Sequence, residues 1–451
     1  MAQWRKDIQV IDDSPQRYEI MMIADDTGNI NDDYHPFKVK FPNGTEDAFG
    51  RIRTSEAFTL GDYKHLYAID PNFLDVITSS ASITHYPNQA CARLAVTSTP
   101  GSKLIHQTKY YHHYMPGKSQ LIKSTFNFYA ATAGVRKRTG YFDTNNGIFF
   151  EQTGTGELAF NIRTYVTGSV DDSTNRVTQA NWNIDKCDGT GKSGFNLDIT
   201  KTQIFFTDFQ WLGVGRVRCG FVHDGKLVIA HEYYNSNNKS TVYMSNPNLP
   251  IRCEIENVNG SSAAYMDQIC STVVAEGGYI ETGQDWAAGN DVLRSVAGAT
   301  GIPVFALRLK NTFKTYENRM TVRLSNINVF TESENVMYKV IKLPNATYIS
   351  GATGPVAWNS FHTDSGVEYA IDGVTYSDGE QLDMGYASAS SQNNNKISSM
   401  PATFAGPSAK KNYIAQNYSS NNSEIYIVYV KNLSASAATN VGVSLQWREI
   451  Y

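Results

Sequence analysis

Short apolar or alternating runs, separated by turn residues, dominate the chain from about residue 50 to residue 335. Successive side chains of a β-strand point to opposite faces, so such runs predict strands that bury one face and wet the other. The expected strands are 118–129, 147–150, 158–166, 204–211, 214–221, 226–234 and 251–255. Their order, with a long polar stretch at 167–196, predicts an all-β protein with a jelly-roll or lectin-like β-sandwich.

Turn residues between these runs favour antiparallel hairpins. Asn145-Asn146-Gly147 and His223-Asp224-Gly225 contain residues that tolerate positive φ, as tight turns between antiparallel strands require. Two segments depart from the strand pattern. Residues 267–275 carry apolar side chains near helical spacing, and with 295–300 they predict short helices that cap the sandwich.

A chain of 451 residues is long enough for two or three domains of about 100 to 200 residues each. Residues 1–50 hold acidic pairs and turn residues but few apolar blocks, which predicts an extended N-terminal docking arm with a strand or two. Residues 51–335 form the expected central β-sandwich domain. Residues 336–451 predict a smaller C-terminal β-sandwich, closed by strong strands at 424–430 and 441–447.

The charge of the chain limits its partners. Charged residues are 18% of the sequence and the formal net charge is −4, so a nucleic-acid partner is not expected. The tight cationic cluster Arg136-Lys137-Arg138 predicts a solvated or interface strand face. No run approaches the roughly 18 apolar residues of a membrane span, and the N-terminus lacks a signal-peptide run, so neither membrane insertion nor export by that route is expected.

The five cysteines are spread singly along the chain, without the spacing of a zinc ligand set. This pattern predicts buried free thiols made in a reducing cytoplasm, with a Cys219–Cys253 disulfide as the alternative. Residues 189–194 do not fit a phosphate loop and predict a flexible loop. The sequence therefore predicts no cofactor.

Three carboxylates are candidates for catalysis. Asp143 and Glu151 flank one predicted hairpin, and Asp208 lies in a separate strand. If they converged across the sandwich they could form a glycosidase pair, which needs two carboxyl groups on either side of a sugar bond. The alternative is that they are structural turn and edge residues.

A histidine- and tyrosine-rich segment contains His106, His112 and His113. Neighbouring strand residues point apart, and no cysteine or carboxylate lies at a ligand spacing, so a surface aromatic strand is favoured over a metal or proton site. The sequence thus predicts no catalytic and no metal-ligating residue.

Tyr-rich aromatic composition, 12% of the chain, offers stacking platforms for sugars as well as core residues. Trp182, Trp211 and Trp286 are expected to pack within the central domain. Trp358 lies in a turn-rich part of the C-terminal domain and is the candidate ligand-binding ring, with packing under a loop as the alternative.

Blocks of the central region carry a resemblance to a known family. The blocks are YHHYMPGKSQ (111–120), GVRKRTGYFDTNNGIFFEQ (134–152), TKTQIFFTDFQWLGVGRVRCGF (200–221), VYMSNPNLPIRCEIEN (242–257) and QICSTVVAEGG (268–278). Over residues 50–330 the chain resembles a widespread family of tailed-phage, marine-phage-like and large-DNA-virus virion structural proteins. The opening residues resemble the start of some marine-phage tail-fibre proteins, which marks Trp4, Arg5 and Lys6 as virion-docking candidates.

This resemblance implies a phage virion structural protein, assembled in the host cytoplasm, that is not an enzyme. The expected form is an oligomeric fibre or appendage subunit of head or tail, a homo-oligomer such as a trimer. Its arm would contact other virion proteins, and its β-domains would face outward. One alternative is a carbohydrate-binding receptor-recognition module for host-surface glycan. A further alternative is a virion-associated glycan hydrolase.

Overall fold

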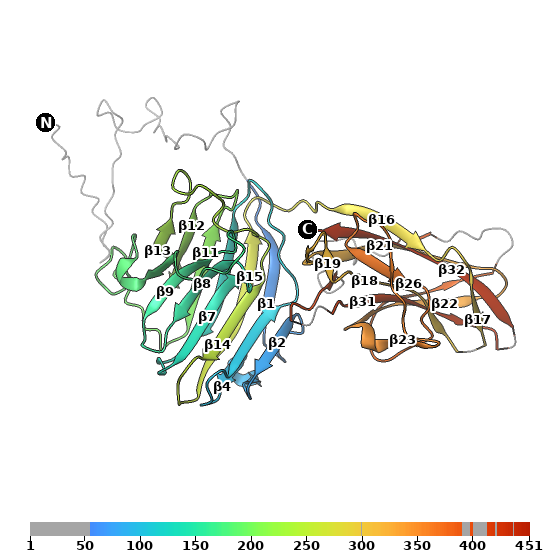
Figure 1. The fold of residues 1–451 in the computed structure, drawn as a ribbon, viewed down its shortest axis with the longest axis horizontal. Coiled ribbons are helices and arrows are strands. Elements are labelled where there is room, and N and C mark those ends of the chain that lie inside the picture. Colours follow the sequence, from blue (N-terminus) through green and yellow to red (C-terminus); the bar gives the residue numbers. More distant parts are fainter. Residues whose placement is uncertain (1–54, 299, 390–396, 400–412, 420–421, 436) are drawn as a thin grey trace, which may run out of the picture. The chain divides into compact units, whose positions relative to one another are not determined.

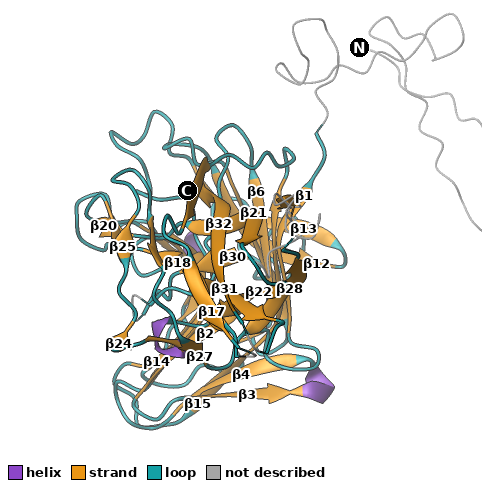
Figure 2. Ribbon diagram, turned by 90° about the vertical axis from the view of Figure 1, so that its right-hand side faces the viewer, coloured by secondary structure: helices purple, strands orange, loops and turns teal. Residues whose placement is uncertain are grey.

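The computed structural model describes residues 55–298, 300–389, 397–399, 413–419, 422–435 and 437–451. Within these ranges the regular secondary structure is almost entirely antiparallel strands (Figure 1, Figure 2). The helical elements there are three 3-10 turns, η1 (Pro87–Gln89), η2 (Gln179–Asn181) and η3 (Ala346–Tyr348). The expected all-β class is confirmed. The expected arm, residues 1–50, lies outside the described residues, as do Trp4, Arg5 and Lys6.

The first sandwich has two sheets. In spatial order the β6 sheet contains β13 (Lys226–Tyr233), β12 (Val217–His223), β11 (Gln203–Phe209), β6 (Gln120–Asn127), β15 (Ala264–Ala275), β4 (Cys91–Val96) and β3 (Ser82–Tyr86), with β1 (Phe58–Lys64) also paired to β15. The β7 sheet contains β10 (Arg176–Thr178), β9 (Leu158–Arg163), β8 (Gly147–Gln152), β7 (Val135–Phe142), β14 (Ile251–Asn257), β5 (Lys103–Thr108) and β2 (Phe73–Thr78).

Alternate residues of both sheets fill the space between them with aromatic rings. Phe150 of β8 is fully buried at the centre of this core. Its ring lies within 6.5 Å, centroid to centroid, of the rings of Phe126, Phe128, Phe160, Trp182, Phe205 and Phe221. Aromatic pairs at such separations stabilise a core beyond the effect of area burial alone.

The second sandwich also has two sheets. The β32 sheet contains β16 (Gln284–Gly289), β32 (Ala438–Ile450), β21 (Thr321–Thr331) and β29 (Ile397–Ser399), with β17 (Arg294–Ala297) paired to β32 and β30 (Tyr413–Ala415) paired to β21. The β31 sheet contains β25 (Asn359–Ser360), β26 (Val367–Ala370), β18 (Ile302–Leu309), β31 (Ile425–Asn432), β22 (Val336–Leu343) and β28 (Glu380–Ala387). Two small sheets pair β19 (Thr312–Phe313) with β20 (Tyr316–Glu317), and β24 (Gly354–Pro355) and β27 (Thr375–Tyr376) with β23 (Ile349–Gly351).

The boundary between the sandwiches was expected at residue 335. Strand pairing instead places it in the segment between β15 and β16. β18 pairs with β31 and β21 pairs with β32, so residues 284–331 belong to the second sandwich. Trp286 accordingly packs against the second core, whereas Trp182 and Trp211 contribute to the first as expected. The partner strands of β18 and β21 are distant in sequence, so local patterns do not reveal them.

The expected short helices are wrong. Residues 267–275 lie in β15, and residues 295–300 overlap β17. In β15 a register shift between Gln268 and Cys270 interrupts the alternation of side chains. A bulge of this kind places apolar residues at spacings that resemble those of a helix.

Both expected hairpins are confirmed. Asp224 and Gly225 join β12 to β13 with φ of 48° and 73°, the two positive values that a tight two-residue turn between antiparallel strands requires. In the turn from β7 to β8 the amide of Asp143 donates to the carbonyl of Asn146 at 2.8 Å, and Gly147 has φ of 141°.

All five cysteines are free thiols. Four are buried as expected, but Cys270 is exposed. The alternative disulfide is not formed, since Cys219 lies in β12 and Cys253 in β14, on different sheets. Burial raises the pKa of both thiols to about 12. Among the described residues, no helix is long and apolar enough to cross a membrane.

Candidate functional site

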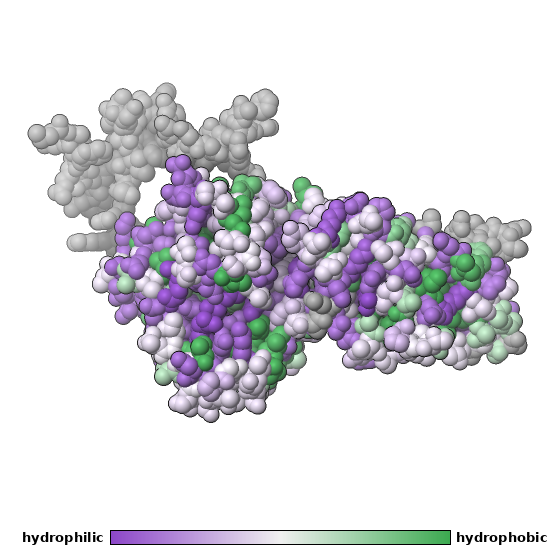
Figure 3. Space-filling view, in the orientation of Figure 1, coloured by the Kyte–Doolittle hydropathy of each residue, from purple (hydrophilic) through white to green (hydrophobic). Residues whose placement is uncertain are grey.

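A groove of about 640 Å³ lies on the second sandwich at β16, β21 and β32. It is lined by Asp285, Trp286, Ala287, Ser325, Asn326, Phe361, Gln446, Trp447 and Arg448. This volume is within the range of sites that hold small ligands. In Figure 3, hydrophilic and hydrophobic residues are interspersed over the face of the second sandwich that is in view.

Strand register brings the polar groove residues into rows. Ala287 lies opposite Gln446, and Gln446 lies opposite Asn326. Asp285 lies opposite Arg448 in the next row. The alternate residues on β32 and β21 pack in the core, so these rows face away from it.

Two side-chain pairs fix the polar groups. The Asn326 amide nitrogen donates to Gln446 Oε1 at 2.7 Å. Arg448 binds Asp285 through two parallel hydrogen bonds of 2.8 and 2.7 Å. These hydrogen bonds raise the pKa of Arg448 and lower that of Asp285, so both groups are charged at neutral pH.

Aromatic rings gather at the same end of the sandwich. The ring of Phe361 lies 5.6 Å from that of Trp286 and 5.5 Å from that of Trp447, both nearly perpendicular. The His362 ring lies 5.1 Å from Trp286. The indole nitrogen of Trp286 is buried and has no hydrogen-bond partner within the described part of the chain.

Glu449 anchors the loop that carries Phe361. This buried carboxylate accepts hydrogen bonds from the Ser365 hydroxyl at 2.6 Å and from the Gly366 amide at 2.9 Å. It also accepts from the indole nitrogen of Trp447 at 3.1 Å. The carboxylate thus ties the loop after β25 to β32.

The three candidate carboxylates of the first sandwich do not converge. Asp143 accepts from the amides of the hairpin turn that it begins, and Glu151 lies about 13 Å further along β8. Asp208 is on the β6 sheet, on the outer face, and pairs with Arg218. Glu151 faces outward from the β7 sheet, so the core separates it from Asp208. The arrangement matches the structural alternative.

The strand face of Arg136 and Arg138 was expected to be solvated or to form an interface, and it is not solvated at Arg138. Its side chain is only 4% exposed and donates to Glu151 at 2.7 Å. Lys137 points into the sandwich, where its amine donates to the carbonyls of Phe128 and Ala130. Burial lowers the pKa of Lys137 to about 8.

Arg138 belongs to a charge network on the outer face of the β7 sheet. Glu254 on the neighbouring strand pairs with Arg252 at 2.6 Å and with Lys103 at 3.3 Å. Further members are Arg163 and Arg176, with Asp172 and Glu256. The signal was present in the sequence, because Arg252 and Glu254 alternate along the predicted strand 251–255 and Glu256 follows it directly. Each of these positive groups contacts at least one carboxylate, and Glu254 is shared by three of them, which is the pattern of a structural network.

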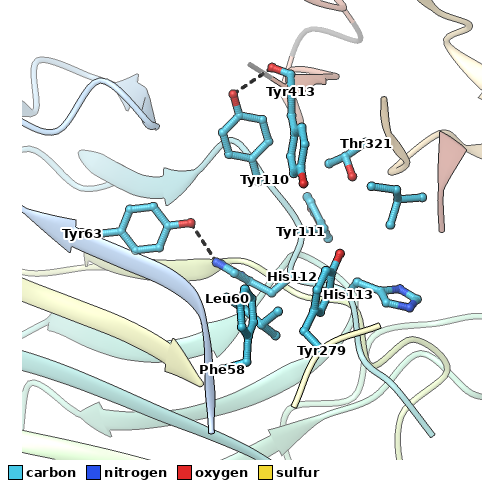
Figure 4. A pocket seen from close by; sticks show the side chains of 11 residues that line it. Phe58, Leu60, Tyr63, Tyr110, Tyr111, His112, His113, Tyr279, Thr321 and Tyr413 are labelled. Atoms are coloured by element: carbon cyan, nitrogen blue, oxygen red, sulfur yellow. Dashed lines mark hydrogen bonds between the residues drawn. The ribbon is translucent and has the colours of Figure 1, made fainter. Parts of the chain in front are cut away.

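The candidate histidines do not form one site. His106 is bound to Asp75 at 2.5 Å, whereas His112 is bound to the Tyr63 hydroxyl at 2.8 Å and to the Leu249 carbonyl (Figure 4). In the same view the His113 ring points away from the hydrogen bond between His112 and Tyr63. No group of three or more potential metal ligands occurs among the residues that the structure describes.

Tyrosines of the same segment line a small cavity with residues of the second sandwich. The Tyr110 hydroxyl donates to the Tyr413 carbonyl at 3.0 Å (Figure 4). Lys342 Nζ lies 3.0 Å from the Tyr110 hydroxyl. Burial raises the pKa of Tyr110 well above 10, so this hydroxyl remains a donor at any ordinary pH. The expected surface aromatic strand is therefore wrong, since Tyr110, Tyr111 and Tyr114 are buried and lie in the loop between β5 and β6.

Buried His65 makes stability depend on pH. Burial, and then the charges of His106 and His85, lower its pKa from 6.5 to about 3. The folded protein resists protonation of His65, so stability is full above pH 6.5 and falls as the pH drops from 6.5 toward 3. The loss should reach about 2 to 3 kcal/mol by pH 4.5. Urea denaturation of His65→Asn should show a shallower pH dependence than the native chain, whereas the exposed His223→Asn should not.

Trp358 lies under a charged side chain. The guanidinium carbon of Arg308 lies 4.2 Å from the centre of the ring, and Arg308 is held by Glu368 at 2.6 Å. One face of the ring is therefore occupied, and its expected ligand-binding role stays a prediction. No comparable signal for the groove is present in the sequence, because its rows form only when β16, β21 and β32 pair.

No protein-family model matches the chain, and no curated protein matches it significantly. Several solved structures are similar in fold. Bacillus licheniformis β-glucanase is 12% identical, with 49% of this chain and 99% of that chain covered at a TM-score of 0.28. The Emp47p carbohydrate recognition domain is 12% identical, with 48% of this chain and 95% of that chain covered at a TM-score of 0.29. A glycoside hydrolase family protein from Mycobacterium thermorestibile is 14% identical, with 48% of this chain and 99% of that chain covered at a TM-score of 0.31. Identities and TM-scores this low say nothing about what this chain binds.

Proposed function

We propose that the protein is a non-catalytic carbohydrate-binding protein whose glycan site is the groove of the second sandwich. The observation that carries this proposal is a row of fixed amide side chains in a groove that is also lined by two partly exposed rings, those of Trp286 and Phe361. Sugars present apolar C–H faces and rings of hydroxyls. Aromatic rings suit the first, and amides, which both donate and accept, suit the second.

The carboxylates of the described residues support a binding role rather than hydrolysis. A glycosidase needs two carboxyl groups about 5 to 10 Å apart, one of them an acid that keeps its proton. In the groove the lining carboxylate is Asp285, and the hydrogen bonds from Arg448 lower its pKa. Asp285 is thus unsuited to donate a proton at neutral pH.

A bulky side chain at Ala287 should abolish glycan binding. Ala287 is exposed and lines the groove, and Ala287→Trp would fill the space over Gln446 without removing any native contact. On a glycan array, the native chain should bind a defined set of glycans, and the variant should lose at least tenfold in affinity for each. Its melting temperature should change by less than about 2 °C.

The matched control is Ala297→Trp. Ala297 is exposed on β17, which pairs with the same strand β32 outside the groove. This variant should bind as the native chain does. Equal loss in both variants, or an array without any bound glycan, would contradict the proposed function.

A virion setting is a further part of the proposal, and it is supported by the resemblance of residues 50–330 to virion structural proteins. In that setting the glycan site would serve attachment to a host surface, and several copies would act together. Mass spectrometry of purified particles from cultures that express the chain would test it, because a particle protein co-purifies in a fixed ratio to the shell proteins.

A further inference from the structure

We infer that the groove recognises a neutral glycan through two neighbouring hydroxyl groups, which bind the exposed side of the Asn326–Gln446 amide pair. This inference rests on the proposed function and names its ligand class. Two observations support it. The amide pair has a donor and an acceptor that make no hydrogen bond within the described chain, and the charged side chains beside it already bind one another.

The amide pair presents one acceptor and one donor together. The bond from Asn326 Nδ2 to Gln446 Oε1 leaves Asn326 Oδ1 and Gln446 Nε2 without a partner among the described residues. The Asn326 side chain is half-buried, and Gln446 is exposed. If oxygen and nitrogen were exchanged in both amides, one acceptor and one donor would still face outward.

A vicinal diol complements this pair. One hydroxyl can donate to the free amide oxygen while its neighbour accepts from the free amide nitrogen. The bond within the pair holds both amides in place before a ligand arrives, which reduces the conformational entropy lost on binding. Ala287, in the same row, is small enough to leave room for a sugar ring above Gln446.

The charges near the pair disfavour an acidic sugar. Arg448 is the cation that lines the groove, and Asp285 already occupies it with two hydrogen bonds. The neighbouring Arg323 is 3.0 Å from Glu281. A sugar carboxylate would have to displace Asp285, or lie beside it without a cation of its own, and both cost free energy.

Titration calorimetry of the full chain tests this inference. The neutral probes are cellotriose, maltotriose and N-acetyllactosamine, and the anionic probes are 3′-sialyllactose and trigalacturonic acid, each in about 50 and 500 mM NaCl. At least one neutral probe should bind, with less than a twofold change in Kd between the two salt concentrations. The anionic probes should bind at least tenfold more weakly.

Gln446→Glu isolates the donor. The substitution keeps the acceptor for Asn326 but replaces the free N–H group by an oxygen, so neutral probes should lose at least tenfold in affinity. Gln381→Glu makes the same change at an exposed position on β28, in the other sheet, and should bind normally.

The outcomes separate the two proposals. Tighter, salt-sensitive binding of an anionic probe that Ala287→Trp abolishes would overturn the neutral ligand class and leave the glycan groove standing. Unchanged neutral binding in Gln446→Glu would overturn the role of the amide pair. Failure of every probe, together with an empty array, would overturn both.

Discussion

Phe150→Ala should destabilise the first sandwich by about 3 to 5 kcal/mol, the range typical of a large aromatic removed from a packed core. Phe150 is fully buried, and six aromatic rings surround it, so the cavity cannot close by the movement of one neighbour. Urea denaturation followed by tryptophan fluorescence should detect the change directly, because Trp182 stacks on Phe160 in the same core at 4.3 Å.

An exposed aromatic provides the comparison. Tyr67 is 97% exposed, and Tyr67→Ala should change stability by no more than about 0.5 kcal/mol. Glycan binding by Phe150→Ala should persist at low temperature, since the groove lies in the second sandwich. A cost below about 1 kcal/mol would mean that the aromatic cluster does not form the core described above.

Glu254→Gln should cost about 3 to 5 kcal/mol, because it removes the negative partner of buried positive groups. The Glu254 side chain is 2% exposed and lies 2.6 Å from Arg252. Lys103 and Arg138 lie within 3.7 Å of its carboxylate. The variant would leave these charges buried and only partly compensated. Equilibrium denaturation at pH 7 measures the loss.

Glu256→Gln is the matched control, since it makes the same change two residues further along the same strand. The Glu256 side chain is 22% exposed and pairs with Arg136 at 2.7 Å, so its loss should cost only about 0 to 1 kcal/mol. The double variant Arg252→Leu/Glu254→Leu should recover most of the loss, because it removes both members of the closest pair. Equal costs for the two single variants would argue against a buried network.

Acid should weaken the same network. Burial acts to raise the pKa of Glu254, but attraction by Arg252, Lys103 and Arg138 outweighs it and holds the pKa well below the ordinary 4.5. The folded pKa is depressed, so the stabilisation is present above pH 4.5 and is lost as the pH falls below it. Glu254→Gln should remove this part of the pH dependence.

Local features of the fold were predictable from the sequence. The hairpin at Asp224 and Gly225 follows from residues that accept positive φ, and the strands around it follow from alternation. Alternation of apolar and polar residues did not reveal β15 as a strand, because a bulge after Gln268 shifts the pattern and makes it resemble that of a helix. The boundary between the sandwiches could not be predicted for another reason. Leu324 pairs with Trp447, a residue far away in the sequence, and local patterns do not reveal such a partner.

The site depends on the same long-range pairing. Ala287, Asn326 and Gln446 are unremarkable as single residues, and they become one row only when three strands align. The charge of Arg138 suggested a solvated surface because its partners Glu151 and Glu254 lie on other strands. Asp208 was chosen as a candidate for its residue type alone, and it lies on a different sheet from Glu151, the carboxylate with which it was expected to act.

Hydrogen–deuterium exchange of the full chain, with and without a glycan from the array, tests the central claim most directly. β16 is an edge strand, so part of its backbone amides are not paired to β32 and remain sensitive to a bound ligand. A glycan in the groove should slow exchange in residues 284–289 and 360–364 and leave the first sandwich unchanged. Protection confined to the first sandwich, at the charge network of the β7 sheet, would contradict the assignment of the site.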